Sequence, residues 1–339
     1  MKKTILVTGG AGYIGAHTVA ELIAQNYDVV IVDNLSVCDE TLLLGIELLT
    51  KTKPSFYPVD CNDYNSLQNV FKLHQIDAVI HFAAFKAVGE STQKPLVYHY
   101  NNVGSLITLL RVMEEFKVKD FIFSSSCTVY GQPDVIPVTE EAPIKKAESP
   151  YGATKQICEQ IIKDVTSQNL KAISLRYFNP IGAHPSAELG ELPIGTPNNL
   201  VPFITQTAAG VRQQLTVFGT DYPTRDGSCI RDYIHVVDLA KAHVAALTYL
   251  LKQSSSTFLD IFNVGTGEGK TVLEVIEAFE RVNKVTLNYT KGPRRPGDVI
   301  QVFADTTYIT KKLGWKPEYT LEDALQHAWE WEKKIRKRQ

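Results

Sequence analysis

Three side chains in the middle of the chain are suited to moving a proton. Tyr151 and Lys155 lie four apart in SPYGATKQICEQ, so on a helix they share one face. A tyrosine, with a reference pKa of about 10, is a poor base at neutral pH, but a nearby cation favours its phenolate. Ser126, in FIFSSSCTVYG, could hydrogen-bond to the same substrate hydroxyl. We predict that Tyr151 is a base, Lys155 its cation and Ser126 part of its proton path, although the pair alone would equally suit an ordinary helix surface.

A glycine series near the N-terminus predicts where a cofactor lies. Gly9, Gly12 and Gly15 fall in TILVTGGAGYIG, between an apolar run and the expected helix HTVAELIAQ, and Tyr13 and Ile14 of the same motif are expected to contact the cofactor. Such glycines let the backbone turn tightly and approach a pyrophosphate, which then faces free amides at a helix N-terminus. The alternative is a simple strand-to-helix turn, and Asp33 argues against it. The series predicts a dinucleotide site, whose oxidised nicotinamide would add a second positive charge near Tyr151.

Acidic residues at the ends of the next two apolar runs indicate which dinucleotide binds. Asp33, eighteen residues past Gly15, can accept hydrogen bonds from an adenosine ribose. A carboxylate there repels a 2′-phosphate, and Asn34 and Leu35 supply no cation, so NAD is favoured over NADP. Asp60, with Cys61 beside it, is placed to meet the adenine amino group. Asp60 could equally be the N-cap of a helix in YNSLQNVF.

The fold that positions these residues is predicted from apolar runs alternating with helical patterns. The runs are continuous, as in parallel strands covered on both faces, and occupy residues 5–9, 28–33, 55–60, 77–84, 120–126 and 172–178. We therefore predict an α/β fold with a doubly wound parallel sheet of the Rossmann type. Ligands bind outside the carboxyl ends of such strands. The predicted strand ends are Gly9, Asp33, Asp60, Ala84, Ser126 and Asn179.

The pattern changes after Asn179. A stretch rich in proline and glycine precedes a helix expected at 201–211, a strand near LTVFG, a helix within 235–252, a strand near VTLNYT and an amphipathic C-terminal helix. We predict an NAD-binding domain at 1–180. Residues 181–339 are expected to form mainly a smaller, mixed α/β substrate-binding lobe, from which the chain could cross back to the main sheet.

Composition excludes several classes of function. The formal net charge is −2, so no general attraction to nucleic acid or to an anionic membrane surface is expected. No stretch approaches the length needed to span a bilayer. Five scattered cysteines without a C-x-x-C pair argue against a metal site and against a disulfide framework, and suit a reducing cytoplasm.

A family resemblance covers residues 1 to about 330. The motifs VTGGAGYIG, VDN, HFAAFKAVGES, FSSSCTVYG, SPYGATK, RYFNPIGAHPS, PNNLVPF, RDYIHVVDLA and RRPGD resemble the extended short-chain dehydrogenase/reductase family and, within it, the UDP-glucose (UDP-galactose) 4-epimerases. The resemblance implies interconversion of two UDP-sugars through a 4-keto intermediate, in a homodimer packed through helices. It implies NAD contacts from Ser36, Phe82, Ala83, Ala84, Lys86, Asn101, Ser124 and Phe178, in addition to the residues above.

The substrate side is expected to hold a diphosphate. Arg231 in CIRDYIH and Arg295 in GPRRPGD are candidate clamps, because guanidinium offers a fork of donors, although each alone would more often be a surface ion-pair partner. The resemblance implies further substrate contacts from Lys86, Ser126, Tyr151, Asn179, Asn199, Leu200, Thr216, Val217, Phe218 and Asp298.

Three residues bear on the alternatives. Related 4,6-dehydratases have an acidic pair where this chain has Cys127 and Thr128, and a related decarboxylase usually has a glutamate at the second position, so both activities are disfavoured. Redox-sensing relatives without chemistry tend to lack the Tyr or the Lys. Val302, in VFAD, is small where a large tyrosine would exclude N-acetyl sugars. We therefore predict some N-acetyl activity, although Val302 could equally be core packing.

Overall fold

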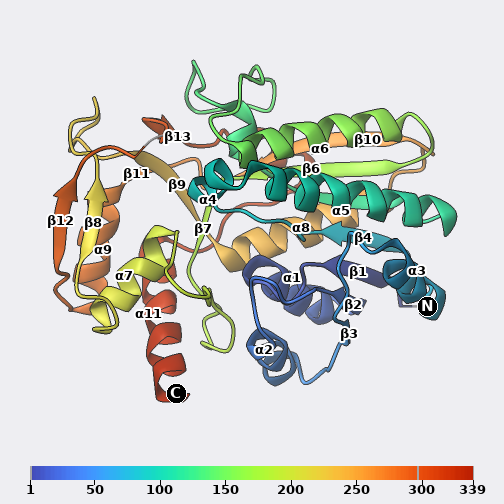
Figure 1. Cartoon of the computed structure of the whole chain (residues 1–339), viewed down its shortest axis with the longest axis horizontal. Helices are drawn as coiled ribbons and strands as arrows, with labels where there is room; N and C mark the ends of the chain where they lie inside the picture. Colours follow the sequence, from blue (N-terminus) through green and yellow to red (C-terminus); the bar gives the residue numbers. More distant parts are fainter. Residues whose placement is uncertain (1, 296–297, 339) are drawn as a thin grey trace.

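A seven-stranded, all-parallel sheet forms the larger part of the computed structural model, which describes residues 2–295 and 298–338 (Figure 1). Its strand order is β10-β6-β5-β4-β1-β2-β3. The strands are β1 Thr4–Thr8, β2 Asp28–Val32, β3 Ser55–Tyr57, β4 Ala78–His81, β5 Asp120–Ser126, β6 Lys171–Tyr177 and β10 Phe258–Val264. The predicted doubly wound α/β fold is confirmed.

Helices cover both faces of this sheet. The helices of the sheet domain are α1 Tyr13–Ala24, α2 Thr41–Thr50, α3 Tyr64–Leu73, α4 Val88–Gln93, α5 Pro95–Glu115, α6 Pro150–Thr166, α8 Val236–Leu251 and α10 Thr307–Leu313. In β1, Ile5 and Val7 pack toward α1 and α8, whereas Leu6 packs toward α3 and α5. Burial on both faces explains why the strands are continuously apolar rather than alternating.

The strand ends differ in detail from those predicted. β5 ends at Ser126 as expected, and Gly9 and Asp33 directly follow β1 and β2. β3 stops at Tyr57, before Pro58, whose nitrogen has no hydrogen to donate to a neighbouring strand. Asp60 therefore lies in a loop beyond β3. Ala84 lies in the loop after β4, which ends at His81, and Asn179 does not end β6 but begins the short strand β7, Asn179–Ile181.

One strand of the main sheet comes from far along the chain. β10 pairs with β6 in parallel from Phe258↔Lys171 to Val264↔Tyr177. It was not predicted, because Asp260 and Asn263 interrupt its apolar run. Thus β10, with α8 and α10, returns to the sheet after the chain has entered the second lobe.

The second lobe lies to the left in Figure 1. It has a four-stranded sheet, in which β9 (Ile230–His235) pairs with β7, β11 (Gly269–Thr271) and β13 (Gln301–Val302). A two-stranded sheet joins β8 and β12, and helices pack around both. The remaining elements are β8 Leu215–Phe218, β12 Tyr289–Gly292, α7 Leu200–Ala208, α9 Val272–Asn283 and α11 Leu321–Arg338. The strand expected at VTLNYT begins only at Tyr289, near the end of that motif.

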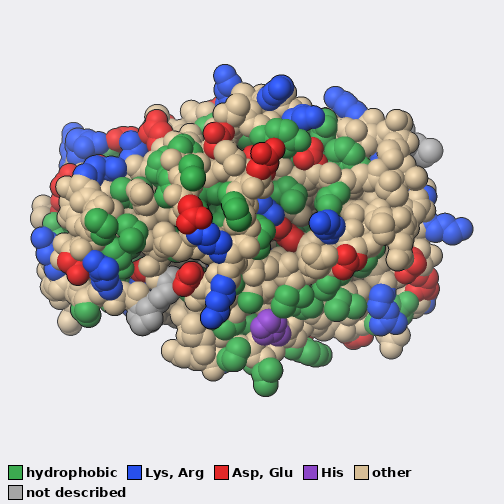
Figure 2. Space-filling model, turned by 90° about the horizontal axis from the view of Figure 1, so that it is seen from above, with side chains coloured by type: hydrophobic (Ala, Val, Ile, Leu, Met, Phe, Trp, Pro, Cys, Tyr) green, Lys and Arg blue, Asp and Glu red, His purple; other side chains and the backbone are tan. Residues whose placement is uncertain are grey.

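The surface carries mixed charge. Figure 2 shows lysine and arginine side chains interspersed with aspartate and glutamate over one face, without a broad area of a single sign. None of the helices in the described part of the chain has an apolar stretch long enough to cross a bilayer.

Candidate active site

The glycine turn between β1 and α1 is shaped to receive an anion. Gly12 is the N-cap of α1 and offers no side chain to the amides of the first turn, and Ala16 is the first residue to donate to it. The amides of Tyr13, Ile14 and Gly15 therefore precede the helical hydrogen-bond ladder. A Cβ on Gly12 would meet only the Gly9 carbonyl oxygen, at 3.3 Å, so the chain leaves room above this turn. These features fit the pyrophosphate of NAD.

Gly15 serves a different purpose. A Cβ there would lie 2.2 Å from the Gly9 carbonyl oxygen and 2.8 Å from the Gly10 Cα. Gly15 is thus required for the close approach of the turn to its own helix, whatever is bound.

Asp33 links the glycine turn to the predicted adenosine end. Its Oδ2 accepts from Ala11 N at 3.1 Å, and its Oδ1 accepts from Leu35 N at 2.9 Å. Burial raises the pKa of Asp33, while these donors and the Cys38 thiol lower it. Leu35 has a positive φ of 56°, so the chain turns sharply just after the carboxylate. Ser36 N donates to Asn34 Oδ1 in the same turn.

Asp60 lies beside this turn. Asn34 Nδ2 donates to its Oδ2 at 3.2 Å, and the buried Cys61 follows it. The alternative that Asp60 caps the next helix is wrong, because Asp63 is the N-cap of α3 and accepts from the amides of Asn65 and Ser66. Asp60 remains exposed at the sheet edge, where the adenine was predicted.

The loop after β4 brings further predicted cofactor residues next to the glycine turn. Phe82 N donates to Thr8 O at 2.9 Å, which continues the β1–β4 pairing, and Ala83 and Ala84 follow, half-buried. The predicted Asn101 is on α5 and donates to Asn102 Oδ1. It is Asn102, which sequence reasoning missed, that accepts from Phe85 N and donates to Phe85 O, so Asn102 anchors this loop.

The three proposed catalytic residues converge at the end of β5. Ser149 caps α6 by accepting from Gly152 N, and Pro150 begins the helix, which buries Tyr151 and Lys155 together. Lys155 Nζ donates to Ser124 O at 2.6 Å and lies 5.9 Å from the centroid of the Tyr151 ring. The Ser126 hydroxyl lies near the Tyr151 phenol and lowers the pKa of that phenol.

Burial is the main influence on the pKa values of Tyr151 and Lys155. Desolvation raises the pKa of Tyr151 well above its usual value of 10.0, and the nearby Ser126 hydroxyl only partly opposes this. Desolvation also lowers the pKa of Lys155 from 10.5 to about 8. The predicted help from Lys155 therefore does not by itself make Tyr151 a base at neutral pH, and a further positive charge near the phenol is needed.

The lowered pKa of Lys155 predicts a pH-dependent stability. Between about pH 8 and pH 10, the unfolded chain holds a proton that folded Lys155 has released, so folding becomes more favourable as pH rises. In urea unfolding without NAD, we expect the unfolding free energy of the wild type, relative to Lys155→Met, to rise by about 1.4 kcal/mol per pH unit in this window. Lys163→Met, on the exposed face of α6, is the control and should follow the wild type. Parallel curves for wild type and Lys155→Met would contradict the assignment.

The two candidate clamp arginines meet at one carboxylate. Arg295 Nε lies 3.1 Å from Asp298 Oδ2, and Arg231 Nη2 lies 3.7 Å from Asp298 Oδ1. The guanidinium of Arg295 also lies over the Phe218 ring, 5.1 Å from its centroid. The structure thus brings four predicted substrate residues together. Pro296 and Gly297 of the RRPGD motif lie outside the described residues.

Other predicted substrate residues are placed less directly. On β8, Phe218 is exposed, but the Val217 side chain is buried in the core cluster of the lobe that also contains Ile204 and Phe279. Thr216 is half-buried on the same strand, and Leu200, at the start of α7, packs against the same core. Asn179 begins β7, where it is the partner of Tyr233 on β9.

Glu191 is the main residue that sequence reasoning missed. Its Oε1 lies 3.3 Å from Lys86 Nζ and accepts from Asn199 Nδ2 at 2.6 Å. Lys86 was predicted to contact both ligands and Asn199 the substrate, so Glu191 joins the two. Its carbonyl oxygen accepts from Trp331 Nε1, which ties it to α11. Because Glu191 lies in a loop of irregular pattern, nothing in the sequence marked it.

Val302 and Phe178, two of the predicted site residues, lie in one small buried cluster. The cluster also contains Tyr130, Val138 and Ala304, among others. The predicted cofactor residue Ser124 lies within β5, and its Oγ is 2.5 Å from the Tyr177 hydroxyl.

Cys127 and Thr128 follow Ser126 in a short 3₁₀ helix, η1 (Cys127–Tyr130), and burial raises the pKa of the Cys127 thiol to about 12. Neither can act as a carboxylic acid would.

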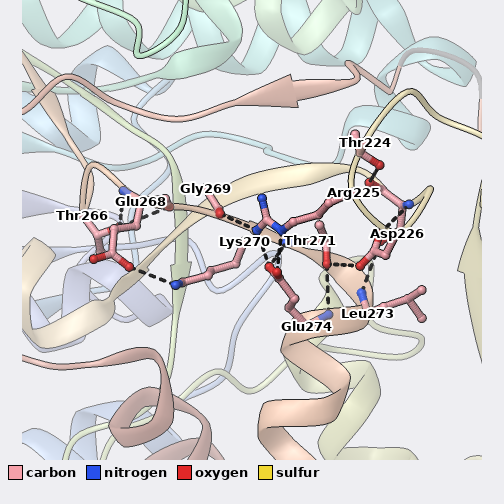
Figure 3. A network of polar contacts seen from close by, with 11 residues as sticks. Thr224, Arg225, Asp226, Thr266, Glu268, Gly269, Lys270, Thr271, Leu273 and Glu274 are labelled. Atoms are coloured by element: carbon pink, nitrogen blue, oxygen red, sulfur yellow. Dashed lines mark hydrogen bonds and ion pairs between the residues drawn. The ribbon is translucent and has the colours of Figure 1, made fainter.

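A polar network steadies the loop that leads into β9. Arg225 pairs with Glu274 and donates to Gly269 O at 2.8 Å, and Asp226 pairs with the Thr271 hydroxyl (Figure 3). Thr271 and Glu274 form the capping box of α9. The loop before Arg231 is therefore fastened to β11 and to the start of α9. Among the described residues, no group of histidine, cysteine, aspartate and glutamate is arranged to hold a metal ion.

Comparison with known proteins finds full-length relatives. A family model described as GDP-mannose 4,6 dehydratase matches residues 6–328. The chain is 48% identical over 330 residues to the UDP-glucose 4-epimerase of Bacillus subtilis, which covers 97% of this chain and 96% of that protein. It is 50% identical over 334 residues to the bifunctional protein GAL10 of Pachysolen tannophilus, covering 96% of this chain but about half (48%) of that longer protein.

A solved structure gives the same result. The UDP-glucose 4-epimerase of Stenotrophomonas maltophila, with bound NAD and formylated UDP-arabinopyranose, matches with a TM-score of 0.96 and 45% identity, covering 99% of this chain and 100% of that one. Although the family model is named for a dehydratase, Cys127 and Thr128 stand where the acidic pair of those enzymes would be. The near-complete relatives are epimerases, and the chain belongs to the UDP-glucose 4-epimerase family of extended short-chain dehydrogenase/reductases.

Proposed function

We propose that this protein interconverts UDP-glucose and UDP-galactose through a 4-keto sugar, with NAD as its cofactor. The observation that carries the proposal is the convergence of Tyr151, Ser126 and Lys155 at the end of β5, two strands from the glycine turn that follows β1. The bound NAD supplies hydride acceptance from the sugar C4 and hydride return to its opposite face.

The chain's own residues move the proton. Tyr151 takes the proton of the sugar 4′-hydroxyl and later gives it back, while Ser126 hydrogen-bonds to the same oxygen. Because burial raises the pKa of Tyr151, its ionisation needs the charge of Lys155 together with that of the oxidised nicotinamide. A base used in both directions suits an epimerase, in which the proton removed is also the proton returned.

Arg231 and Arg295 hold the diphosphate in this proposal. Both arginines face the Asp298 carboxylate in the structure. When a diphosphate binds, the two guanidinium groups would pair with its phosphates instead, and Asp298 would be free to accept from a uridine or ribose hydroxyl. Lys86 would leave Glu191 in the same way to meet a phosphate. Tight binding of the nucleotide leaves the keto sugar free to rotate about its link to the anchored phosphate.

Substrate range provides the test. We expect the purified protein to interconvert UDP-glucose and UDP-galactose without net release of NADH, and to turn over UDP-N-acetylglucosamine and its galacto epimer as well. The measurement is a turnover assay with these four UDP-sugars, followed by product separation and by absorbance of reduced cofactor. Stoichiometric NADH in solution would instead indicate a dehydrogenase, and would contradict the proposal.

The N-acetyl activity is proposed to depend on Val302. Replacing it with tyrosine adds bulk within the cluster that also contains Phe178. We expect Val302→Tyr to lower N-acetyl turnover by about tenfold or more relative to plain sugars, because a pocket filled by a larger side chain excludes the larger substrate. Val302→Ala is the matched control and should keep both activities. Equal losses on all four sugars in Val302→Tyr would show core damage rather than a specificity role.

We also propose a homodimer through α5, in the cytoplasm. Leu96, Tyr100 and Ile107 lie on α5 at spacings of four and seven, which is one helix face, and their side chains are exposed, Leu96 to 82%. Five free cysteines suit a reducing compartment. We expect the wild type to sediment as a dimer and Leu96→Glu as a monomer, because the added charge would be buried. Leu73→Glu, at an exposed leucine on α3, is the control; a dimer in both variants would place the interface elsewhere.

A further inference from the structure

Asp232 is a buried carboxylate that joins three segments of the substrate lobe. Its side chain is fully buried, and no lysine or arginine among the described residues forms an ion pair with it. Instead, its Oδ1 accepts from Thr266 N and Thr266 Oγ1, both at 2.7 Å. Its Oδ2 accepts from Gly267 N and Ala304 N, both at 3.1 Å. Four donors compensate a charge that burial alone would make costly.

The position of Asp232 on β9 sets it apart from an ordinary buried acid. Its neighbour Arg231 pairs across the sheet with Val302, and Asn179 pairs with Tyr233. Strand β9 thus carries Arg231, proposed for the diphosphate, and pairs with the strands that carry Val302, proposed for the sugar, and Asn179, proposed for the substrate. Successive side chains of a strand point to opposite faces, so Asp232 points away from Arg231.

Asp232 holds the segment that carries Val302. Ala304, whose amide it binds, follows Val302 by two residues. On its other edge the segment is held by Val138, which donates to Phe303 O at 2.9 Å and accepts from Asp305 N at 2.8 Å. Arg231 has supports of its own, namely the β9 ladder, Ile230 O and Asp298. Loss of the Asp232 carboxylate would therefore loosen the segment that carries Val302 more than it loosens Arg231.

We propose that Asp232 is a positioning residue that sets the width of the sugar pocket by fixing residues 302–304 against β9. The inference rests on the proposed function, because it takes Val302 to border the sugar. Asp232 touches neither substrate nor cofactor in this assignment, and acts through the backbone of Ala304.

Asp232→Asn is the main test. The amide has the same shape, but one oxygen becomes an NH₂ group that cannot accept from a backbone N–H. If the NH₂ faces Gly267 and Ala304, both of these amides lose their acceptor. If it faces Thr266, the hydroxyl can turn but the Thr266 amide then opposes a second donor, so the side chain must shift and its remaining bond to Ala304 N is displaced. We expect turnover of UDP-galactose to fall about tenfold, and the ratio of N-acetyl to plain turnover to change at least about threefold. The Kd for UDP should change by less than about twofold.

Thr266→Val is the matched control. It removes one donor to the same carboxylate and leaves the Ala304 contact in place. We expect Thr266→Val to lower the thermal midpoint without changing the ratio of N-acetyl to plain turnover. If Asp232→Asn does not fold, Asp232→Ser, which leaves space for a water to serve the donors, enters the same assays.

Each outcome decides the proposal. A changed turnover ratio in Asp232→Asn, with UDP affinity kept and the ratio of Thr266→Val unchanged, supports it. A parallel fall of UDP affinity and turnover, an equal change of ratio in Thr266→Val, or loss of folding in both Asp232 variants would overturn it, since each indicates a purely structural role. A wild type that turns over none of the four UDP-sugars would contradict the proposed function itself, whereas an active wild type with an unchanged ratio in Asp232→Asn contradicts only this inference.

Discussion

Tyr151→Phe is expected to lower epimerase turnover by about three orders of magnitude, within the range for loss of a general base. The change removes the hydroxyl that is assigned to take the 4′-hydroxyl proton and to return it. The ring stays in its buried position on α6, so packing is kept. Turnover of UDP-galactose is the measurement, with binding of NAD and UDP followed separately, and both ligands should bind nearly as in the wild type.

Tyr308→Phe is the control for loss of a tyrosine hydroxyl. Its hydroxyl donates to Asp260 Oδ1 at 3.2 Å, on α10 and away from β5. We expect near-normal turnover in this variant. Near-normal epimerisation in Tyr151→Phe would show that another group is the base, and Ser126 would be the next to examine.

Gly12→Ala and Gly15→Ala are expected to fail for different reasons. At Gly12 the backbone has φ −78° and ψ 172°, which alanine adopts readily, and a Cβ would meet only the Gly9 oxygen, at 3.3 Å. The apo chain should therefore fold, but a methyl group would occupy the space where the pyrophosphate approaches the amides. We expect NAD affinity to fall about a hundredfold or more, at about 1.4 kcal/mol for each factor of ten.

Gly15→Ala should damage the protein before any ligand is added. Its Cβ would lie 2.2 Å from the Gly9 oxygen, so the turn must open. We expect a lower thermal midpoint without NAD, together with loss of NAD binding. Calorimetric binding and thermal unfolding without NAD separate the two variants. If Gly12→Ala bound NAD normally, the cofactor would not approach this turn; if it lost stability as Gly15→Ala does, its glycine would serve the fold alone.

The sheet was predictable where burial acts on both faces of a strand. β5 has the predicted bounds, and its six residues from Phe121 to Ser126 are all buried. β10 could not be predicted, because Asp260 and Asn263 find partners only in the folded chain: Asp260 binds Tyr308, and Asn263 binds Tyr130. Local patterns report burial, but they do not report partners that are distant in sequence.

The candidate site was predictable where the proposed chemistry requires a particular residue type. It was missed where a residue only holds another residue in place. Tyr151, Lys155 and Ser126 lie together as expected from their types and spacing. Glu191, Asn102 and Asp232 act by holding Lys86, Phe85 and Ala304, and their contacts depend on segments that only the tertiary structure brings near. The expected effect of Lys155 on Tyr151 was also overestimated, because desolvation of both groups cannot be read from the helix spacing.

The late return of β10 has a consequence for how the chain is made. Until residues 258–264 leave the ribosome, β6 is an edge strand whose N–H and C=O groups have no partner on one side. A nascent chain that has completed the glycine turn and the Tyr151 helix would therefore expose a strand edge able to pair with another chain. The sheet domain is closed only by a segment synthesised after β9, so the cofactor side of this protein cannot finish folding before much of its substrate side exists.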